Sequence, residues 1–347
     1  MPKRFLLRHV GNMGDLVFFV PPVLETIKRR YPDSHITFVT AWGFRNKRSQ
    51  WGQRNQGGFC ISLLMTNPHV DQLVHYDDRR VSLSGDICQE EGHRFPTWSA
   101  AYYEEQKKVG GYDVVCELDF GLSITDNPIQ RMYDALGLPE ETQSAYQLYL
   151  TESDRAVARW VMAEYPRPRI VLLEGLDGRT TRGWDPDKVP ALTQAIRSTY
   201  GVYPVWFGAK HTPEYHGRPL TLRENIATLE GADVAIGVLS GPLHFAAAVG
   251  TPTITLYADQ PIHRAAPAYF LNGAIADPKR RHRTLLGPQP SPFTLLKGEE
   301  APKALTSAER SVQGYRSWVE PGRQSTKAAV APLTVDEVMS VLHDMLQ

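Results

Sequence analysis

The sequence has no surplus of charge of either sign, since 38 Lys and Arg residues stand against 38 Asp and Glu residues in 347. A dedicated nucleic-acid-binding protein normally carries a basic surplus, and a highly charged disordered chain carries a surplus of one sign. Both classes are therefore excluded, and we expect no nucleic acid among the partners. At 347 residues the chain is long enough for two domains.

Cysteines and long apolar runs are also scarce. Cys60, Cys88 and Cys116 form no CxxC pair, so neither a disulfide framework nor a structural zinc site is expected. The longest apolar run, 16–24, contains two prolines and is far shorter than the roughly 20 residues of a membrane-spanning helix. The first residues lack the apolar core of a secretory signal. We expect a soluble, cytoplasmic protein with reduced thiols and no bound metal.

What the sequence does contain is an alternation of strands and helices. An apolar run at 3–10 ends at a glycine, a helical pattern spans 14–31, and a second strand pattern follows at 35–40. Weaker strand patterns lie at 72–76 and 112–118, with a helical pattern at 128–137. A strand, a glycine turn, a helix and a strand form a βαβ unit, which predicts a parallel sheet covered by helices.

A second series of the same kind begins near residue 166. Strand patterns at 169–174, 203–207, 234–237 and 253–257 alternate with helical patterns at 189–200, 222–231 and 242–249. We therefore predict an α/β protein with domains at 1–165 and 166–347. Residues 277–332, rich in Pro, Gly, Lys and Arg, are expected to form loops. A helix at 334–346, capped by Thr334 and Glu337, ends the chain and can pack back on the N-terminal domain.

Three loops after strands are candidate binding sites. The first, Gly11-Asn12-Met13-Gly14-Asp15, joins the first strand to its helix. Its glycines let a ligand approach the backbone, and Asp15 at a helix start is a candidate catalytic acid or base. An acid there also simply stabilises the helix, so the residue type alone does not decide. The loop is not a GxGxxG fingerprint, which argues against a nicotinamide-dependent enzyme.

The second loop is Ser240-Gly241-Pro242-Leu243-His244, whose free amides at a helix start suit a phosphate. His244 taken alone is as well explained by a structural role. The third loop, at 178–184, contains Thr180, Thr181 and Arg182, whose hydroxyls and guanidinium suit a diphosphate. A solvated surface loop is the alternative there.

Two stretches resemble glycosyltransferase family 9, the heptosyltransferases. RHVGNMGDLVFFVPPVLETIKRRYPDSHITFVT resembles the family's amino-terminal signature, and TLRENIATLEGADVAIGVLSGPLHFAAAVGTPTITLY resembles its carboxyl-domain signature. Between them, RGWDPDKVPAL resembles a segment that the family usually writes K-x-W-P. The resemblance implies a GT-B fold, in which two Rossmann-like domains face each other across a cleft.

The resemblance also implies an activity and roles for single residues. The family transfers a sugar, typically from ADP-heptose to the inner core of lipopolysaccharide, with inversion and without a metal or other cofactor. Asp15 then matches the general base, while Gly11, Asn12, Met13 and Gly14 match the acceptor loop. The residues that match the donor and phosphate site are Thr180, Thr181, Arg182, Ser240, Gly241, Pro242 and His244.

One departure bears on the substrate. The family normally has Asp where this chain has Leu239, and leucine cannot accept a hydrogen bond from a sugar hydroxyl. Another donor sugar, or a natural product or protein as acceptor, therefore stays an alternative. So does a non-catalytic nucleotide- or glycan-binding relative. The basic run 279–283 suits an anionic acceptor or the inner membrane surface, or is a solvated loop.

Overall fold

The computed structural model of the chain describes residues 2–9, 14–40, 59–75, 103–118, 128–138, 146–176, 184–208, 213–257, 267, 281–286 and 332–347. They divide into two compact units, with the boundary between Tyr149 and Leu150. Each unit is built on its own parallel sheet.

The first unit has a four-stranded sheet in the order β3-β2-β1-β4. Its central strand β1 is buried from Phe5 to His9, as expected for a parallel strand covered on both faces. The elements of this unit, in chain order, are β1 Arg4–His9, α1 Asp15–Phe18, α2 Val20–Arg30, β2 His35–Thr40, α4 Phe59–Leu64, β3 Gln72–His75, β4 Val114–Glu117 and α7 Pro128–Leu136.

The helical pattern predicted at 14–31 is two helices in the structure. Pro21 and Pro22 occupy the first turn of α2, where proline has no hydrogen bond to lose, and Phe19 stands between α1 and α2. The short α1 therefore directs the chain away from β1, and α2 returns along the sheet.

The second unit has a five-stranded parallel sheet in the order β11-β10-β9-β5-β6. Its elements are α8 Glu152–Met162, β5 Ile170–Leu173, α9 Lys188–Tyr200, β6 Val205–Phe207, β7 Glu214–Tyr215, β8 Arg218–Pro219, α10 Leu222–Glu230, β9 Val234–Val238, α11 Gly241–Ala248, β10 Thr253–Tyr257, β11 His282–Leu286 and α16 Val335–Leu346.

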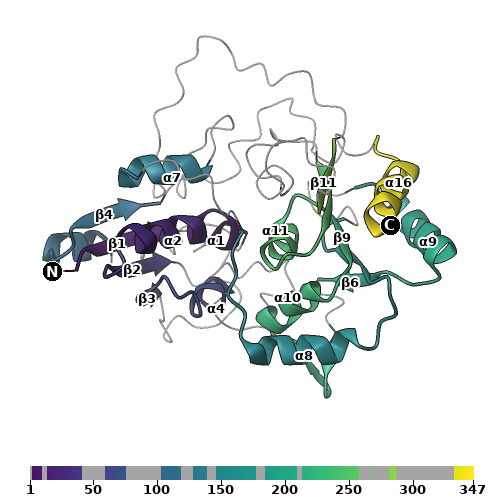
Figure 1. Cartoon of the computed structure of the whole chain (residues 1–347), viewed down its shortest axis with the longest axis horizontal. Helices are drawn as coiled ribbons and strands as arrows, with labels where there is room; N and C mark the ends of the chain where they lie inside the picture. The colour runs from purple at the N-terminus through teal and green to yellow at the C-terminus, as the bar shows by residue number, and fades with distance from the viewer. Residues whose placement is uncertain are drawn as a thin grey trace, which may run out of the picture. The chain divides into compact units, whose positions relative to one another are not determined.

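The strand order distributes the helices of the second unit. The chain moves outward from β5 to β6 and then in the opposite direction through β9 to β10, so right-handed crossovers put α9 on one face and α10 and α11 on the other. In Figure 1, α16 lies beside α9, and α10 and α11 lie across the sheet from them.

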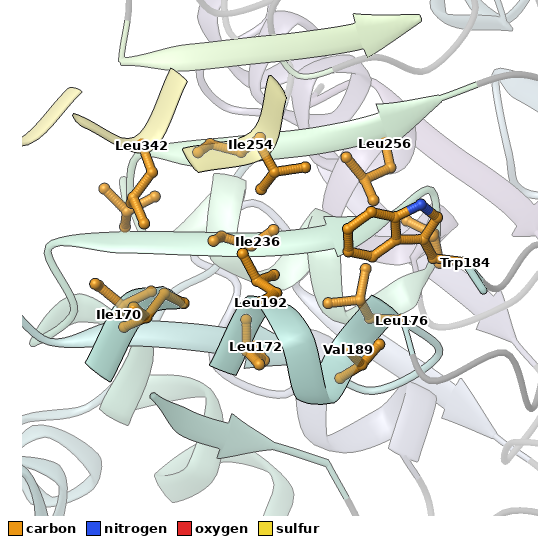
Figure 2. Close-up of a cluster of buried hydrophobic side chains, with 14 of the residues drawn as sticks. Ile170, Leu172, Leu176, Trp184, Val189, Leu192, Ile236, Ile254, Leu256 and Leu342 are labelled. Carbon is orange, nitrogen blue, oxygen red and sulfur yellow. The ribbon is translucent and has the colours of Figure 1, made fainter. Parts of the chain in front are cut away.

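The main core of the second unit lies between the sheet and the α9–α16 layer (Figure 2). Leu192 of α9, Ile236 of β9, Ile254 of β10 and Leu342 of α16 are all fully buried in it. Trp184 is buried there too, and its indole Nε1 donates to the Leu333 carbonyl at 3.0 Å. Trp184, which ends the third candidate loop, therefore fixes that loop to the core.

Three expectations need correction. The final helix α16 packs on α9, β9 and β10 of the second unit, because Val338 and Leu342 complete the core there. The region expected to form loops contains β11, because its five residues pair in parallel with β10. The segment 150–165, assigned by sequence to the first domain, lies in the second unit because α8 packs on α10 and Asp154 pairs with Arg223 at 2.7 Å.

Candidate functional site

The first candidate loop leaves the sheet of the first unit where its strand order reverses. From β1 the chain proceeds to β2 and β3 on one side, whereas β4 lies on the other side. In open α/β sheets, ligands bind at the carboxyl ends of the strands at such a switch point. The loop that leads from β1 to Asp15 starts there.

The structure places part of this loop. Gly14 precedes α1, and its carbonyl accepts from the amides of Val17 at 3.2 Å and Phe18 at 3.0 Å. Asp15 is the first residue of α1, as the sequence predicts. Gly11, Asn12 and Met13 lie outside the described residues. The backbone thus brings Asp15 to the carboxyl edge of β1.

The second unit has its own switch point, between β5 and β9. These two strands are paired, with Leu172 opposite Ile236. The third candidate loop follows β5, and Ser240 and α11 follow β9. Thr180, Thr181 and Arg182 lie outside the described residues, but the loop that contains them leaves the same corner of the sheet as Ser240.

The start of α11 carries a buried side-chain hydroxyl that forms no hydrogen bond within the described residues. Ser240 is the N-cap with an extended backbone, φ −158° and ψ 169°, yet its side chain makes no capping hydrogen bond. Within the described residues its buried Oγ has no hydrogen-bond partner at all. The amides of Gly241 and Leu243, in the first turn, cannot bond within the helix either. A hydroxyl and two amides at a positive helix end form a binding site for an anion.

Gly241 is a glycine that packing does not require. A Cβ built at this position would have Phe245 Cζ as its nearest atom, at 4.0 Å. Gly237 is the opposite case, because a Cβ there would lie 2.8 Å from Leu173 Cδ1. A glycine here leaves the backbone open to close approach of a ligand at the helix start.

The other predicted residues of this segment follow the helix inward. Pro242 takes the second helical position, where its missing amide costs nothing. His244 is buried, and its amide donates to the Ser240 carbonyl at 3.2 Å. Leu239 is buried as well, so an apolar side chain stands just before the N-cap.

Sequence reasoning missed a cluster in the first unit. Arg8 and His9 are buried at the end of β1, and Arg8 pairs with Glu117 of β4. The signal in the sequence was a basic pair that interrupts an otherwise apolar strand, since buried charges are rare unless they are paired. This cluster adjoins the first switch point.

Two absences hold for the part of the chain that the structure describes. There, no three His, Cys, Asp or Glu side chains are grouped so that they could hold a metal ion. Nor is any helix in these ranges long and apolar enough to cross a bilayer.

Comparison with known proteins gives one sequence match and several fold matches. The model of glycosyltransferase family 9 (heptosyltransferase) matches residues 218–279, a stretch that includes α10, β9, α11 and β10. No significant match was found among curated proteins.

Several of the solved structures that match cover nearly the whole chain. A glycosyltransferase family 9 protein from Veillonella parvula has a TM-score of 0.58 at 14% identity, covering 99% of this chain and 97% of its own. The E. coli heptosyltransferase WaaC, solved with ADP-2-deoxy-2-fluoro heptose, has a TM-score of 0.52 at 14% identity, covering 98% and 99%. The E. coli ADP-heptose lps heptosyltransferase II has 0.54 at 15% identity, covering 99% and 98%.

These identities are low, so the solved structures establish the fold, and the expectation of a GT-B protein is confirmed. The family model matches the segment around Ser240 independently of the fold comparison. The similarity as a whole supports a glycosyltransferase. The resemblance seen in the sequence is thus confirmed: the chain is similar to glycosyltransferase family 9 over residues 218–279 and has a GT-B fold.

Proposed function

We propose that the protein is an inverting, metal-independent glycosyltransferase that moves a sugar, most simply a heptose, from an ADP-sugar to a hydroxyl acceptor. The observation that carries this proposal is the start of α11, where the buried Ser240 hydroxyl has no hydrogen-bond partner among the described residues and the first-turn amides cannot bond within the helix. WaaC, a relative in fold, was solved with an ADP-sugar analogue, which supports an adenine nucleotide as the donor part.

Inverting transfer is a single in-line displacement. The acceptor oxygen forms a bond to the anomeric carbon while the bond to the diphosphate breaks, and the acceptor hydroxyl loses its proton. The protein must hold both substrates, accept the proton and stabilise the diphosphate that leaves. In this proposal the second unit binds the donor, and the first unit binds the acceptor.

Asp15 is the proposed general base. Its place at the carboxyl edge of β1 and the start of α1 is the place where an acceptor would lie in an open α/β sheet. A carboxylate at a helix N-terminus is a weak base. It therefore acts late, when the acceptor hydroxyl has already begun to lose its proton.

The diphosphate is assigned to groups at the second switch point. The amides of Gly241 and Leu243 and the Ser240 hydroxyl provide hydrogen-bond donors, while Arg182, with Thr180 and Thr181, supplies charge and further hydroxyls. Arginine binds phosphate oxygens in a bidentate manner, so it replaces the lysine of the family with a different geometry. His244 and Pro242 complete the segment by shaping the first turn of α11.

A second candidate is the same reaction with another donor sugar or with an acceptor other than lipopolysaccharide. Leu239 favours it, because a buried leucine stands where the family has an acid that contacts sugar hydroxyls. The proposal also includes lipopolysaccharide core as the acceptor, a contact with a membrane surface and a cytoplasmic location.

Nucleotide binding tests the donor assignment. The melting temperature is measured with ADP, UDP, GDP and dTDP added separately. A ligand at 100 times its Kd adds about 2.7 kcal/mol to stability, which shifts the melting temperature by a few degrees. We expect a shift with ADP alone. A shift with another nucleotide would remove ADP-heptose as donor, and no shift at all would favour a relative that has lost the site.

A further inference from the structure

At one end, the strands β1 and β4 are linked by side-chain contacts as well as by backbone hydrogen bonds. Arg8 and Glu117 are opposite each other in register and form an ion pair between their side chains. His9 Nδ1 donates to the Leu118 carbonyl at 2.5 Å, and the Leu118 amide donates to the Arg8 carbonyl at 2.7 Å. We call Arg8, His9, Glu117 and Leu118 the β1–β4 clamp.

The clamp lies at the switch point of the first unit, since β1 and β4 are the neighbours at which the strand order reverses. His9 is the last residue of β1, and Glu117 is the last residue of β4. The chain that continues from His9 reaches Gly14 and Asp15 only a few residues later. Whatever fixes the end of β1 therefore fixes the origin of the candidate acceptor loop.

The two side-chain contacts of the clamp act on opposite faces of the sheet. Phe5 of β1 contacts Tyr31 at the end of α2, with ring centroids 5.7 Å apart, so odd-numbered residues of β1 face the helices α1 and α2. Leu6 instead packs with Val39 and Tyr103 on the other face. Arg8 therefore shares the face of Leu6, and His9 faces the layer that begins with Asp15.

The composition of the clamp is costly for a structural joint. Arg8 is only 1% exposed, whereas the side chain of its partner Glu117 is 28% exposed, and removing the guanidinium from water costs free energy that an apolar residue would not. His9 is 4% exposed. Because a carbonyl can only accept, the contact with Leu118 fixes His9 as an Nδ1–H tautomer in one ring orientation.

We propose that His9 is a positioning residue for the acceptor site. Through its bond to the Leu118 carbonyl it holds the end of β1 against β4 and so sets where the loop to Asp15 begins. The part of the inference that concerns catalysis rests on the proposed function, whereas the part that concerns the loop does not.

The opposite end of the same two strands provides a matched control. There the Arg4 amide donates to Asp113 Oδ2 at 2.7 Å, and the Asp113 amide donates to the Arg4 carbonyl at 2.8 Å. This joint links the same strands with a similar number of bonds, but it lies far along the strands from the loop. Asp113→Asn replaces a charged acceptor by a weaker, neutral one, so it weakens strand pairing at this end without touching the switch point.

The test compares two amide substitutions in the full-length protein. His9→Asn retains a donor near the position of Nδ1, whereas His9→Gln moves its amide to the position of Nε2. Hydrogen exchange is followed at the amides of Val17 and Phe18, which bond to the Gly14 carbonyl, with the Tyr31 amide at the end of α2 as reference. Losing one hydrogen bond should accelerate exchange by about tenfold.

We expect His9→Gln to accelerate exchange at Val17 and Phe18 by that factor relative to Tyr31. His9→Asn and Asp113→Asn should leave the ratio unchanged. Equal ratios in His9→Gln and His9→Asn, or the same rise in Asp113→Asn, would overturn the inference.

Turnover is the second readout. With ADP-heptose and heptose-free lipopolysaccharide core as the probes, His9→Gln should lower kcat and leave the KM for ADP-heptose unchanged, and His9→Asn should restore kcat. A kcat that falls equally in both variants would contradict the positioning role. If the wild-type protein transfers no sugar to this probe, the assignment of ADP-heptose and lipopolysaccharide core as its substrates fails, and the exchange ratios alone decide on the clamp.

Discussion

At the scale of single residues, two helix N-caps in the second unit distinguish fold from function. Thr221 caps α10 with a reciprocal capping box, in which its hydroxyl accepts from the Glu224 amide. Ser240 caps α11 and makes no such bond. Both residues carry a hydroxyl, but only Thr221 uses it to cap its helix. The pair therefore provides a direct test of the donor site.

The first prediction concerns this pair. Thr221→Ala should lower stability by about 1 kcal/mol, because the cap is lost, and should leave ADP affinity unchanged. Ser240→Ala should leave stability nearly unchanged and weaken ADP binding by roughly fivefold to tenfold, the effect of one hydrogen bond. Thermal unfolding and isothermal titration measure the two quantities. A loss of stability without loss of affinity in Ser240→Ala would remove Ser240 from the site.

The second prediction concerns glycines. Gly241→Ala has room for its Cβ and gains helix propensity, so we expect unchanged or slightly higher stability together with weaker ADP binding. Gly237→Ala should instead destabilise the second unit by about 1–3 kcal/mol, because its Cβ would clash with Leu173. Full ADP affinity in Gly241→Ala would mean that no ligand approaches this backbone.

At the scale of elements, periodicity predicted the helices that bury one apolar face and the strands that are buried along their whole length. α10 and α16 were both predicted, and for α16 the cap was predicted too, because Thr334 precedes patterned apolar residues and Glu337 follows three residues later. β11 was missed, since its residues follow a basic run and only pairing with β10 makes them a strand. The packing of α8 and α16 is decided by contacts far apart in sequence, such as Asp154 with Arg223, which no local pattern contains.

The third prediction concerns α16. Leu342 is fully buried in the core between α16, α9 and the sheet, so Leu342→Ala should destabilise the protein by about 2–5 kcal/mol. Asp344, on the same helix, makes an exposed ion pair with Arg283 at 3.1 Å. Asp344→Ala should therefore cost at most about 1 kcal/mol. Similar denaturation midpoints for the two variants would show that α16 is not part of the core.

The fourth prediction concerns β11 and pH. Burial, with a smaller effect of Arg281, lowers the pKa of His282 to about 4, and its Nδ1 lies 2.9 Å from Thr253 Oγ1. The unfolded chain binds this proton below about pH 6.5. The contribution of the neutral, buried His282 to the free energy of unfolding is therefore fully present above that pH. It is lost as the pH falls towards 4, at up to about 1.4 kcal/mol per pH unit.

The check is the melting temperature at pH 7 and pH 5. The decrease between these two values should be smaller in His282→Asn than in the wild type. His343→Asn, which changes an exposed histidine, should leave the decrease as it is. A decrease that is identical in His282→Asn and the wild type would contradict the link between β11 and pH.

At the scale of the whole molecule, the chain consists of two units, each with its own parallel sheet and its own switch point. The sequence predicted this repetition, and it predicted the three candidate loops at strand ends. It could not predict the β1–β4 clamp, because Glu117 meets Arg8 only through the pairing of strands more than a hundred residues apart. The proposed reaction needs one group from each unit, Asp15 from the first and the start of α11 from the second.

Transfer by the wild-type protein and by Asp15→Asn tests this account most directly. Both proteins are incubated with ADP-heptose and heptose-free lipopolysaccharide core, and ADP release and the mass of the acceptor are followed together. The account predicts stoichiometric ADP and heptosylated core in the wild type. It predicts a loss of about 10²–10⁴ in kcat for Asp15→Asn, with ADP binding unchanged. Equal turnover in the two proteins would contradict the role of Asp15, and ADP binding without transfer to any acceptor would contradict the enzyme itself.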